Sequence, residues 1–306
     1  MIDKLIEGIK ATKSPICVGL DTMHTYLPKE FTPDREKPLK SIGAALFDFN
    51  KEIIDAVNDI VPSVKVQAAY YEQYGPAGMK AFKKTIDYAK KRGMTVIADV
   101  KRNDIGSTAA AYSTAYLGGI EMGGETVMAY NADFATVNAY LGTDGVAPFL
   151  ADCKKYGKGI FVLVKTSNPS GGEIQDRRMP VKPLYMTMAD MVDKWGEELM
   201  GDYGYSAVGA VVGATYKKQG ERLRKRHPHM FFLIPGYGAQ GATADDIAVN
   251  FDKEGLGGVV NSSRGILLAY RKEKYQGMRF WEAARAATLD MREDILNAFK
   301  RSGIEL

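Results

Sequence analysis

The sequence predicts an α/β protein in which eight parallel strands close into a barrel. Two observations support this fold: short apolar runs recur through the 306 residues, and segments with helical spacing separate them. Strands that alternate with helices form parallel sheets, and at this length they fit a single (β/α)8 TIM barrel. The eight runs are Ile16 to Leu20, Val64 to Ala69, Val96 to Val100, Ala135 to Ala139, Ile160 to Val164, Ala207 to Val212, Phe231 to Ile234 and Gly257 to Val260.

The segment before the first run, residues 1–10, has apolar residues at helical spacing and is predicted to cap the bottom of the barrel. It carries acidic residues and has no long hydrophobic stretch, so it matches neither a signal peptide nor a membrane span. Three connections are long, at residues 22–45, 105–133 and 168–183, and the last leads into a helix near residues 185–200. No Pro/Ser-rich linker divides the chain, which predicts one domain over residues 1–306.

The composition argues against several functional classes. The net charge is only +4, and the densest basic clusters, Lys217-Lys218 and Arg222 to Arg226, fall on one predicted helix. This pattern is typical of a solvated helix face, so nucleic-acid binding is not expected. The two cysteines, Cys17 and Cys153, are far apart and offer no disulfide framework or zinc motif. They favour a reducing cytoplasm and two simply packed thiols.

The most informative stretch is residues 96–108, because it places charged residues where an apolar run stops. Strand side chains alternate between the two faces of a sheet, so Asp99 and Lys101 should share one face. Asp104 follows just past the strand, where Gly106 lets the backbone turn. Ser107 or Thr108 could begin the next helix there.

A second lysine, Lys65, lies inside another apolar run. Buried charges are costly unless they are paired, so two Lys and two Asp at strand ends favour an alternating charge array held for chemistry. A structural ion-pair network is the alternative. Barrel enzymes place their chemistry at the carboxyl ends of the strands, and Asp21 and Thr166-Ser167 end two further strands. All these side chains should therefore meet at one mouth.

The last two predicted strands lead into glycine-containing loops, residues 235–242 and 261–266. Glycines let backbone N–H groups approach an anion closely, and the loops after strands 7 and 8 of such barrels often bind phosphate. Gln240 can donate an amide hydrogen bond, and Arg264 can donate a bidentate charged one. The Gly-x-Gly-x-x-Gly pattern at 236–241 is not a dinucleotide fingerprint, because it follows the seventh strand. A phosphate site is predicted instead.

With these motifs, the sequence resembles the orotidine 5′-phosphate decarboxylases in their longer bacterial form. The Asp-x-Lys-x-x-Asp-Ile-x-x-Thr element is specific in combination with the phosphate loops and much less so alone. The matching pieces span nearly the whole barrel and are Ile16-Cys17-Val18-Gly19-Leu20-Asp21, Val64-Lys65-Val66, Asp99-x-Lys101-x-x-Asp104-Ile105-x-x-Thr108, Thr166-Ser167-Asn168-Pro169, Pro235-Gly236-x-Gly238-Ala239-Gln240-Gly241 and Ser263-Arg264-Gly265. The sequence departs from compact members in its long insertions and at residues 170–173.

The resemblance implies an enzyme that converts orotidine 5′-phosphate to UMP, the last step of de novo pyrimidine nucleotide synthesis, with no cofactor and no metal. It also implies a homodimer with shared active sites, in which Asp104 and Thr108 reach into the neighbouring site. The resemblance implies that Lys101 is the proton donor, in an array with Asp99, Asp104 and Lys65. It implies that Asp21 and Lys65 contact the ribose and that Ser167 contacts the pyrimidine. The implied phosphate-binding residues are Gln240 and Arg264, and the loop glycines Gly238 and Gly265 are also implied to bind the substrate.

The charge array also suits this chemistry. Removing carbon dioxide from an orotate ring leaves a carbanion at C6 with no adjacent carbonyl to delocalise it, and the chain offers no metal or pyridoxal motif. One unit-charge pair at about 4 Å and an effective dielectric near 20 is worth about 4 kcal/mol, or about a thousandfold in rate. Lys101 can stabilise the carbanion and then protonate it, while Asp99 and Asp104 orient Lys101 and keep it charged.

Two other functions stay open on the sequence alone. Phosphosugar enzymes of the same barrel superfamily, such as 3-keto-L-gulonate 6-phosphate decarboxylase or hexulose-phosphate synthase, resemble the chain in Asp-x-Lys-x-x-Asp but use magnesium. The other alternative is a nucleotide-binding protein that kept the pocket and lost turnover. Asp21, Lys65 and the Pro-Gly-x-Gly-Ala-Gln loop favour the nucleotide enzyme, and the intact Lys and Asp set argues against the binding protein.

Overall fold

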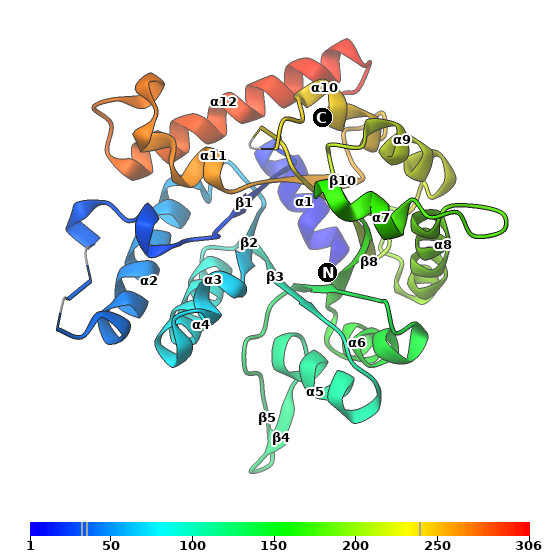
Figure 1. Cartoon of the computed structure of the whole chain (residues 1–306), viewed down its shortest axis with the longest axis horizontal. Helices are drawn as coiled ribbons and strands as arrows, with labels where there is room; N and C mark the ends of the chain where they lie inside the picture. The colour runs from blue at the N-terminus through cyan, green and yellow to red at the C-terminus, as the bar shows by residue number, and fades with distance from the viewer. Residues whose placement is uncertain (32, 35, 239) are drawn as a thin grey trace.

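The computed structural model describes residues 1–31, 33–34, 36–238 and 240–306. Eight of its strands form a closed parallel barrel, in which they are hydrogen-bonded in the order β1-β10-β9-β8-β7-β6-β3-β2. Figure 1 shows the barrel in the centre of the molecule. This confirms the predicted (β/α)8 TIM barrel. The strands are β1 (Ile16–Gly19), β2 (Ser63–Gln67), β3 (Thr95–Arg102), β6 (Phe134–Val137), β7 (Gly159–Lys165), β8 (Val208–Val212), β9 (Phe232–Pro235) and β10 (Gly258–Ser262).

Helices connect the strands and surround the barrel (Figure 1). Strands buried on both faces read as continuous apolar runs, which is why each run marks a strand within two residues of its ends. The helices are α2 (Pro38–Val57), α3 (Ala69–Glu72), α4 (Gly75–Lys91), α5 (Gly106–Tyr116), α6 (Thr143–Tyr156), α7 (Gly172–Gln175), α8 (Leu184–Gly196), α9 (Lys217–Arg226), α10 (Ala244–Ile247), α11 (Arg264–Leu267) and α12 (Phe280–Arg301).

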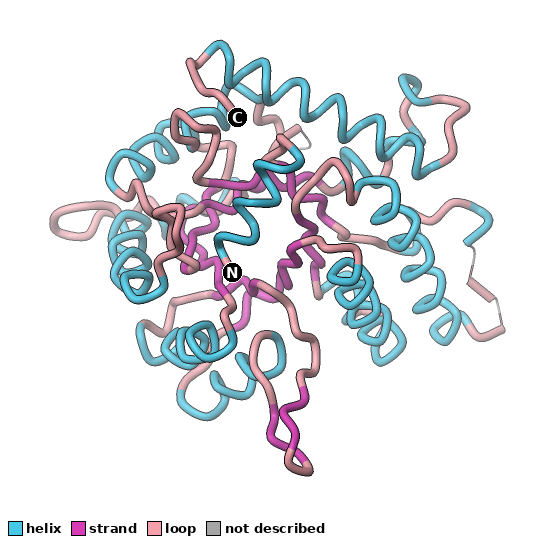
Figure 2. Tube along the Cα trace, turned by 180° about the vertical axis from the view of Figure 1, so that it is seen from behind, coloured by secondary structure: helices cyan, strands magenta, loops and turns pink. Residues whose placement is uncertain are grey.

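The N-terminal helix α1 (Ile2–Thr12) caps the bottom of the barrel, as predicted, and Figure 2 shows it crossing that end. Its apolar side chains Ile2, Leu5, Ile6 and Ile9 are all buried. They form one cluster with inward-facing strand residues that include Cys17, Ile97, Phe134 and Phe161. Burial of each such aliphatic side chain stabilises the fold by about 1.5–3 kcal/mol. The helix thus closes one end of the core.

The long connections contain structure of their own. Residues 105–133 form α5 and then an antiparallel hairpin of β4 (Ile120–Met122) and β5 (Glu125–Val127), which projects from the barrel (Figure 1). Helix α5 begins at Gly106, one residue before the predicted start. No helix among the described residues is long and apolar enough to span a membrane.

The predicted solvated basic face is wrong at one position of α9. Arg224 is buried, and its guanidinium donates to the carbonyl oxygens of Asn250, Met230 and Gly257 at 2.6 to 2.9 Å. Burial lowers the pKa of Arg224 to about 10. The local charge run could not show this, because the carbonyl groups that accept these bonds belong to residues outside α9, 6 to 33 residues along the chain from Arg224.

The two cysteines are free and buried, as predicted. Burial raises the pKa of the Cys17 thiol to about 12, so it stays protonated at neutral pH. Cys17 therefore acts as a small apolar side chain of the lower core.

Candidate active site

The carboxyl ends of the strands surround one cavity of about 760 Å3 at the mouth of the barrel. Seven of the predicted site residues line this cavity, although they come from six strands or the loops that follow them. They are Asp21, Lys65, Asp99, Lys101, Ser167, Gln240 and Arg264. The predicted convergence of these side chains on one mouth is therefore observed.

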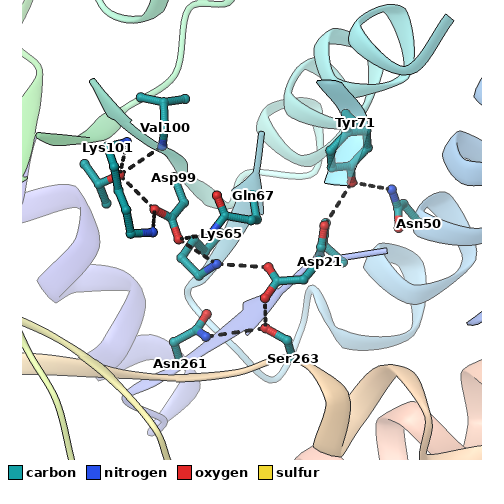
Figure 3. Close-up of polar contacts among 12 residues, drawn as sticks. Asp21, Asn50, Lys65, Gln67, Tyr71, Asp99, Val100, Lys101, Asn261 and Ser263 are labelled. Carbon is teal, nitrogen blue, oxygen red and sulfur yellow. Dashed lines mark hydrogen bonds and ion pairs between the residues drawn. The ribbon is translucent and has the colours of Figure 1, made fainter. Parts of the chain in front are cut away.

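Four charged side chains form a continuous chain of ion pairs across this cavity (Figure 3). The Lys65 ammonium lies 2.9 Å from Asp21 Oδ1 and 3.0 Å from Asp99 Oδ2. The other oxygen of Asp99 lies 2.6 Å from the Lys101 ammonium. The charges alternate in sign, so the array is neutral as a whole.

Burial and charge act in opposite directions on the inner pair. Burial alone would raise the pKa of Asp99, but the charges of Lys65 and Lys101 outweigh it and hold that pKa well below its ordinary value. Burial alone would lower the pKa of Lys65, but Asp21 and Asp99 outweigh it and hold that pKa well above its ordinary value. Both groups are therefore charged at neutral pH.

Lys101 occupies a special backbone position at the end of β3. Its φ of +45° lies in the left-handed region, and the register between β3 and β6 shifts between Ala98 and Arg102. This left-handed conformation costs a non-glycine residue about 1–2 kcal/mol of conformational free energy. Asp99 and Lys101 do converge as predicted, but a bulge brings them together rather than simple strand alternation. The Lys101 side chain is 43% exposed and faces the cavity.

Thr136 on β6 holds this bulge in place, and sequence reasoning missed it. Its hydroxyl accepts hydrogen bonds from the backbone N–H groups of Val100 and Lys101, both at 2.9 Å. The same hydroxyl donates to Asp99 Oδ1 at 2.8 Å. Gln67 also donates to Asp99, at 2.9 Å. The only signal for Thr136 was a polar residue inside an apolar run.

The Asp21 end of the array is held by a residue that directly follows β10, the strand that pairs with β1. Ser263 donates to Asp21 Oδ2 at 2.7 Å, and Asn261 donates to the Ser263 hydroxyl at 3.4 Å (Figure 3). A Cβ at Gly19 would come within 1.9 Å of the Ser263 hydroxyl. Glycine is therefore required at Gly19 for Ser263 to reach Asp21.

Asp104 and Thr108 lie apart from the array within one chain. Asp104 accepts a hydrogen bond from the Ile105 N–H at 2.8 Å, and neither residue lines the cavity. Thr108 is exposed on the first turns of α5. A single chain thus assembles Asp21, Lys65, Asp99 and Lys101 but leaves these two outside.

The predicted phosphate loops flank the same cavity. Gln240 and Arg264 line it, and Arg264 also lines a second cavity of about 770 Å3 together with Gly238 and Gly265. Gly236 has a φ of +109°, and a Cβ added there would lie 3.0 Å from the Gln240 side-chain oxygen, so the loop folds back over itself. Ala239, part of the sequence motif, lies outside the described residues.

A buried lysine that sequence reasoning missed anchors the loop that carries Ser167. The ammonium of Lys165 is fully buried, lies 2.9 Å from both oxygens of Asp176, and sits 4.0 Å from the centre of the Tyr216 ring. Next to this pair, Gln175 accepts from the Thr166 N–H and donates to the Thr166 hydroxyl. These contacts hold helix α7 against the end of β7, beside Ser167.

A closed barrel with a buried Lys/Asp array, next to two loops that offer amide and guanidinium donors, defines an enzyme-type site for a small anionic substrate. The chain matches the family model "Orotidine 5'-phosphate decarboxylase / HUMPS family" over residues 14–276. It belongs to this family, which confirms the resemblance found in the sequence.

Relatives and solved structures agree with this assignment. An orotidine 5′-phosphate decarboxylase of Rhodopirellula baltica is 46% identical over 95% of this chain and 97% of its own length. One of Clostridium acetobutylicum is 43% identical over 96% of this chain and 98% of its own length. The structure of a candidate orotidine-monophosphate-decarboxylase of Toxoplasma gondii covers 98% of this chain and 97% of its own, with 30% identity and a TM-score of 0.81.

The pKa directions give a pH prediction for stability. Asp99 has a lowered pKa in the folded state, so its stabilising contribution is complete above its unfolded pKa of about 4 and is lost as the pH falls below that value. Lys65 has a raised pKa, so its contribution is complete below about 10 and is lost as the pH rises further. We expect the difference in unfolding free energy between wild type and Asp99→Asn to be constant from about pH 5 to 9 and to shrink below about pH 4. Urea unfolding across this range measures it, and a transition near neutral pH would contradict the assigned charges.

Proposed function

We propose that this chain decarboxylates orotidine 5′-phosphate to UMP at the mouth of the barrel, with Lys101 as the proton donor. The observation that carries this proposal is the Lys101 ammonium, held 2.6 Å from Asp99 at the cavity end of a buried charge array. The anion-binding side chains Gln240 and Arg264 line the same cavity. In this proposal residues 1–306 work as one domain, in the cytoplasm.

Substrate binding uses both ends of the cavity. Arg264 and Gln240 bind the 5′-phosphate. Gly238 and Gly265 line the adjoining cavity, which Arg264 also lines, and as glycines they let the two loops come close to the phosphate. Asp21 and Lys65 hold the ribose hydroxyls, and Ser167 contacts the pyrimidine. Binding energy from the phosphate, which does not react, then fixes the ring over the array.

The array supplies the chemistry. The bond between C6 and the carboxylate breaks, the electron pair stays on C6, and carbon dioxide leaves. The Lys101 ammonium stabilises this carbanion by charge and then transfers a proton to C6, which gives UMP and a neutral amine that regains a proton from water. Asp99 stays ionised throughout, because Lys65 keeps its charge paired when Lys101 has given up its proton.

A homodimer completes the site in this proposal. Thr108 lies in the first turn of α5 and Asp104 lies two residues before that helix, where both can enter the site of a second copy. The surrounding surface is apolar and open: Ile105 is 57% exposed, Tyr140 is 81% exposed and Leu141 is 50% exposed. A twofold contact there would cover these side chains and bring each Asp104 to the other chain's Lys101.

The loss of orotidine 5′-phosphate absorbance, measured with and without EDTA, tests the proposed activity. We expect turnover to survive exhaustive chelation, because the Lys/Asp array stabilises the carbanion through its own charges. Loss of turnover in EDTA with recovery in magnesium would move the chain to the magnesium-dependent phosphosugar enzymes of the superfamily. Binding of UMP without any turnover would identify a nucleotide-binding protein instead.

Two substitutions separate the chemical step from phosphate binding. Lys101→Ala should lower kcat by about a thousandfold or more, while UMP still binds through Gln240 and Arg264.

Arg264→Ala should lower kcat/KM for orotidine 5′-phosphate by about ten- to a hundredfold and affect orotidine, which lacks the phosphate, much less. Steady-state kinetics and UMP titration calorimetry measure both. Near-normal turnover by Lys101→Ala would remove its assigned role, and equal losses of Arg264→Ala on both substrates would indicate misfolding.

Mixed dimers test the shared site. Lys101→Ala and Asp104→Ala homodimers should each be nearly inactive, because every site then lacks one member. In a mixed dimer both defects fall in one site and leave the other intact, so equal mixing with free exchange should restore roughly a quarter of all sites. Activity is measured after exchange has been demonstrated with differently tagged chains. No recovery under those conditions would show that Asp104 does not act across the interface.

A further inference from the structure

The loop after β9, residues 236–242, lies between two cavities. Gln240 of this loop lines the substrate cavity, while Gly238 lines the cavity behind it together with Asp290 and Asp294 of α12. Tyr237 lines both cavities and so marks the boundary between them. The loop therefore has open space on either side, and packing alone does not fix its position.

The backbone of this loop is permissive. Gly236, Gly238 and Gly241 have φ values of +109°, +67° and +91°, in the region that glycine enters without penalty. Two of the loop's hydrogen bonds close on the loop itself, from the Gly238 N–H to the Ala242 carbonyl and from the Gly241 N–H to the Gly238 carbonyl, both at 2.9 Å. They shape the turn but do not attach it to the barrel.

One side chain attaches the loop to a long helix. The Tyr237 hydroxyl donates to Asp294 Oδ2 at 2.6 Å, and among the described residues 236–238 and 240–242 this is the only side-chain hydrogen bond that leaves the loop. Helix α12 packs against α2 and α11 and runs along one side of the barrel (Figure 1). The bond therefore joins a permissive loop to a fixed support.

We infer that the hydrogen bond from Tyr237 to Asp294 positions the loop so that Gln240 faces the substrate phosphate. This inference rests on the proposed function, because it assigns the phosphate to Gln240. Tyr237 and Asp294 are then positioning residues, since the bond acts on the ligand through Gln240. Burial and the bond to Asp294 raise the pKa of Tyr237, so its hydroxyl remains a donor across the working pH range.

The test compares Tyr237→Phe, which removes only the hydroxyl, with Asp294→Ala and with the double variant. A hydrogen bond to a charged group is lost in each, so we expect UMP affinity and kcat/KM for orotidine 5′-phosphate to fall about tenfold. Affinity for uridine, which lacks phosphate, should stay unchanged. The double variant should lose no more than either single variant, because all three lack the same bond.

Tyr275→Phe is the matched control. The Tyr275 hydroxyl donates to Asp290 of the same helix, also at 2.6 Å, but Tyr275 lies outside the loop. This variant should keep wild-type affinity for UMP. Thermal unfolding of every variant accompanies the titrations, so that a loss of fold is seen separately from a loss of affinity.

The outcomes separate this inference from the proposed function. If wild type decarboxylates orotidine 5′-phosphate and Tyr237→Phe binds UMP normally, the inference is overturned and the function stands. Equal losses for UMP and uridine, or additive losses in the double variant, would also overturn it. If wild type binds UMP without decarboxylation, the proposed function fails, and the affinities still decide whether the hydrogen bond positions the loop.

Discussion

The buried ammonium of Lys65, held between Asp21 and Asp99, is the constraint on which the rest of the site depends. Removing one partner of a buried ion pair leaves an uncompensated charge and costs about 3–5 kcal/mol, so the three side chains must arrive together. They come from β2, from the end of β1 and from β3. The register pairs Gly19 with Lys65 and Gln67 with Asp99, and a slip of one residue would turn Lys65 to the other face. The charges thus specify the pairing of three strands.

In the proposed mechanism, the same array also orients Lys101 as the proton donor and keeps it paired with Asp99. Asp99 shares its two oxygens between Lys65 and Lys101. Lys101 is the exposed end of the array, and its backbone lies in the left-handed region. The Thr136 hydroxyl accepts hydrogen bonds from the backbone N–H groups of Val100 and Lys101. The local strain is sustained because the surrounding barrel overdetermines the position. Charge stabilisation of a developing carbanion is greatest when the donor is already oriented in this way.

Much of the barrel and the array could be predicted because their signals are local. Strands buried on both faces are continuous apolar runs, and charged residues at their ends converge by the geometry of a parallel barrel. Other contacts were not predictable, because each joins residues whose proximity only the fold creates. Thr136 on β6 contacts the bulge of the neighbouring β3, and Lys165 contacts Asp176, which directly follows α7. Arg224 contacts the backbone carbonyl groups of Met230, Asn250 and Gly257. Asp104 and Thr108 illustrate a different limit, since one chain alone does not bring them to the cavity.

Two of the contacts that the sequence did not reveal, those of Lys165 and Tyr237, connect loops at the mouth of the barrel to other parts of the fold. The ion pair of Lys165 with Asp176 fixes the loop that carries Ser167, and the hydrogen bond of Tyr237 with Asp294 fixes the loop that carries Gln240. The array is held mainly by residues on or next to the strands themselves, namely Thr136, Gln67 and Ser263. A site built this way keeps its charged centre rigid while its ligand-holding loops depend on a few polar anchors. Under the proposed function, substitutions at those anchors would change phosphate binding without disturbing the charge array.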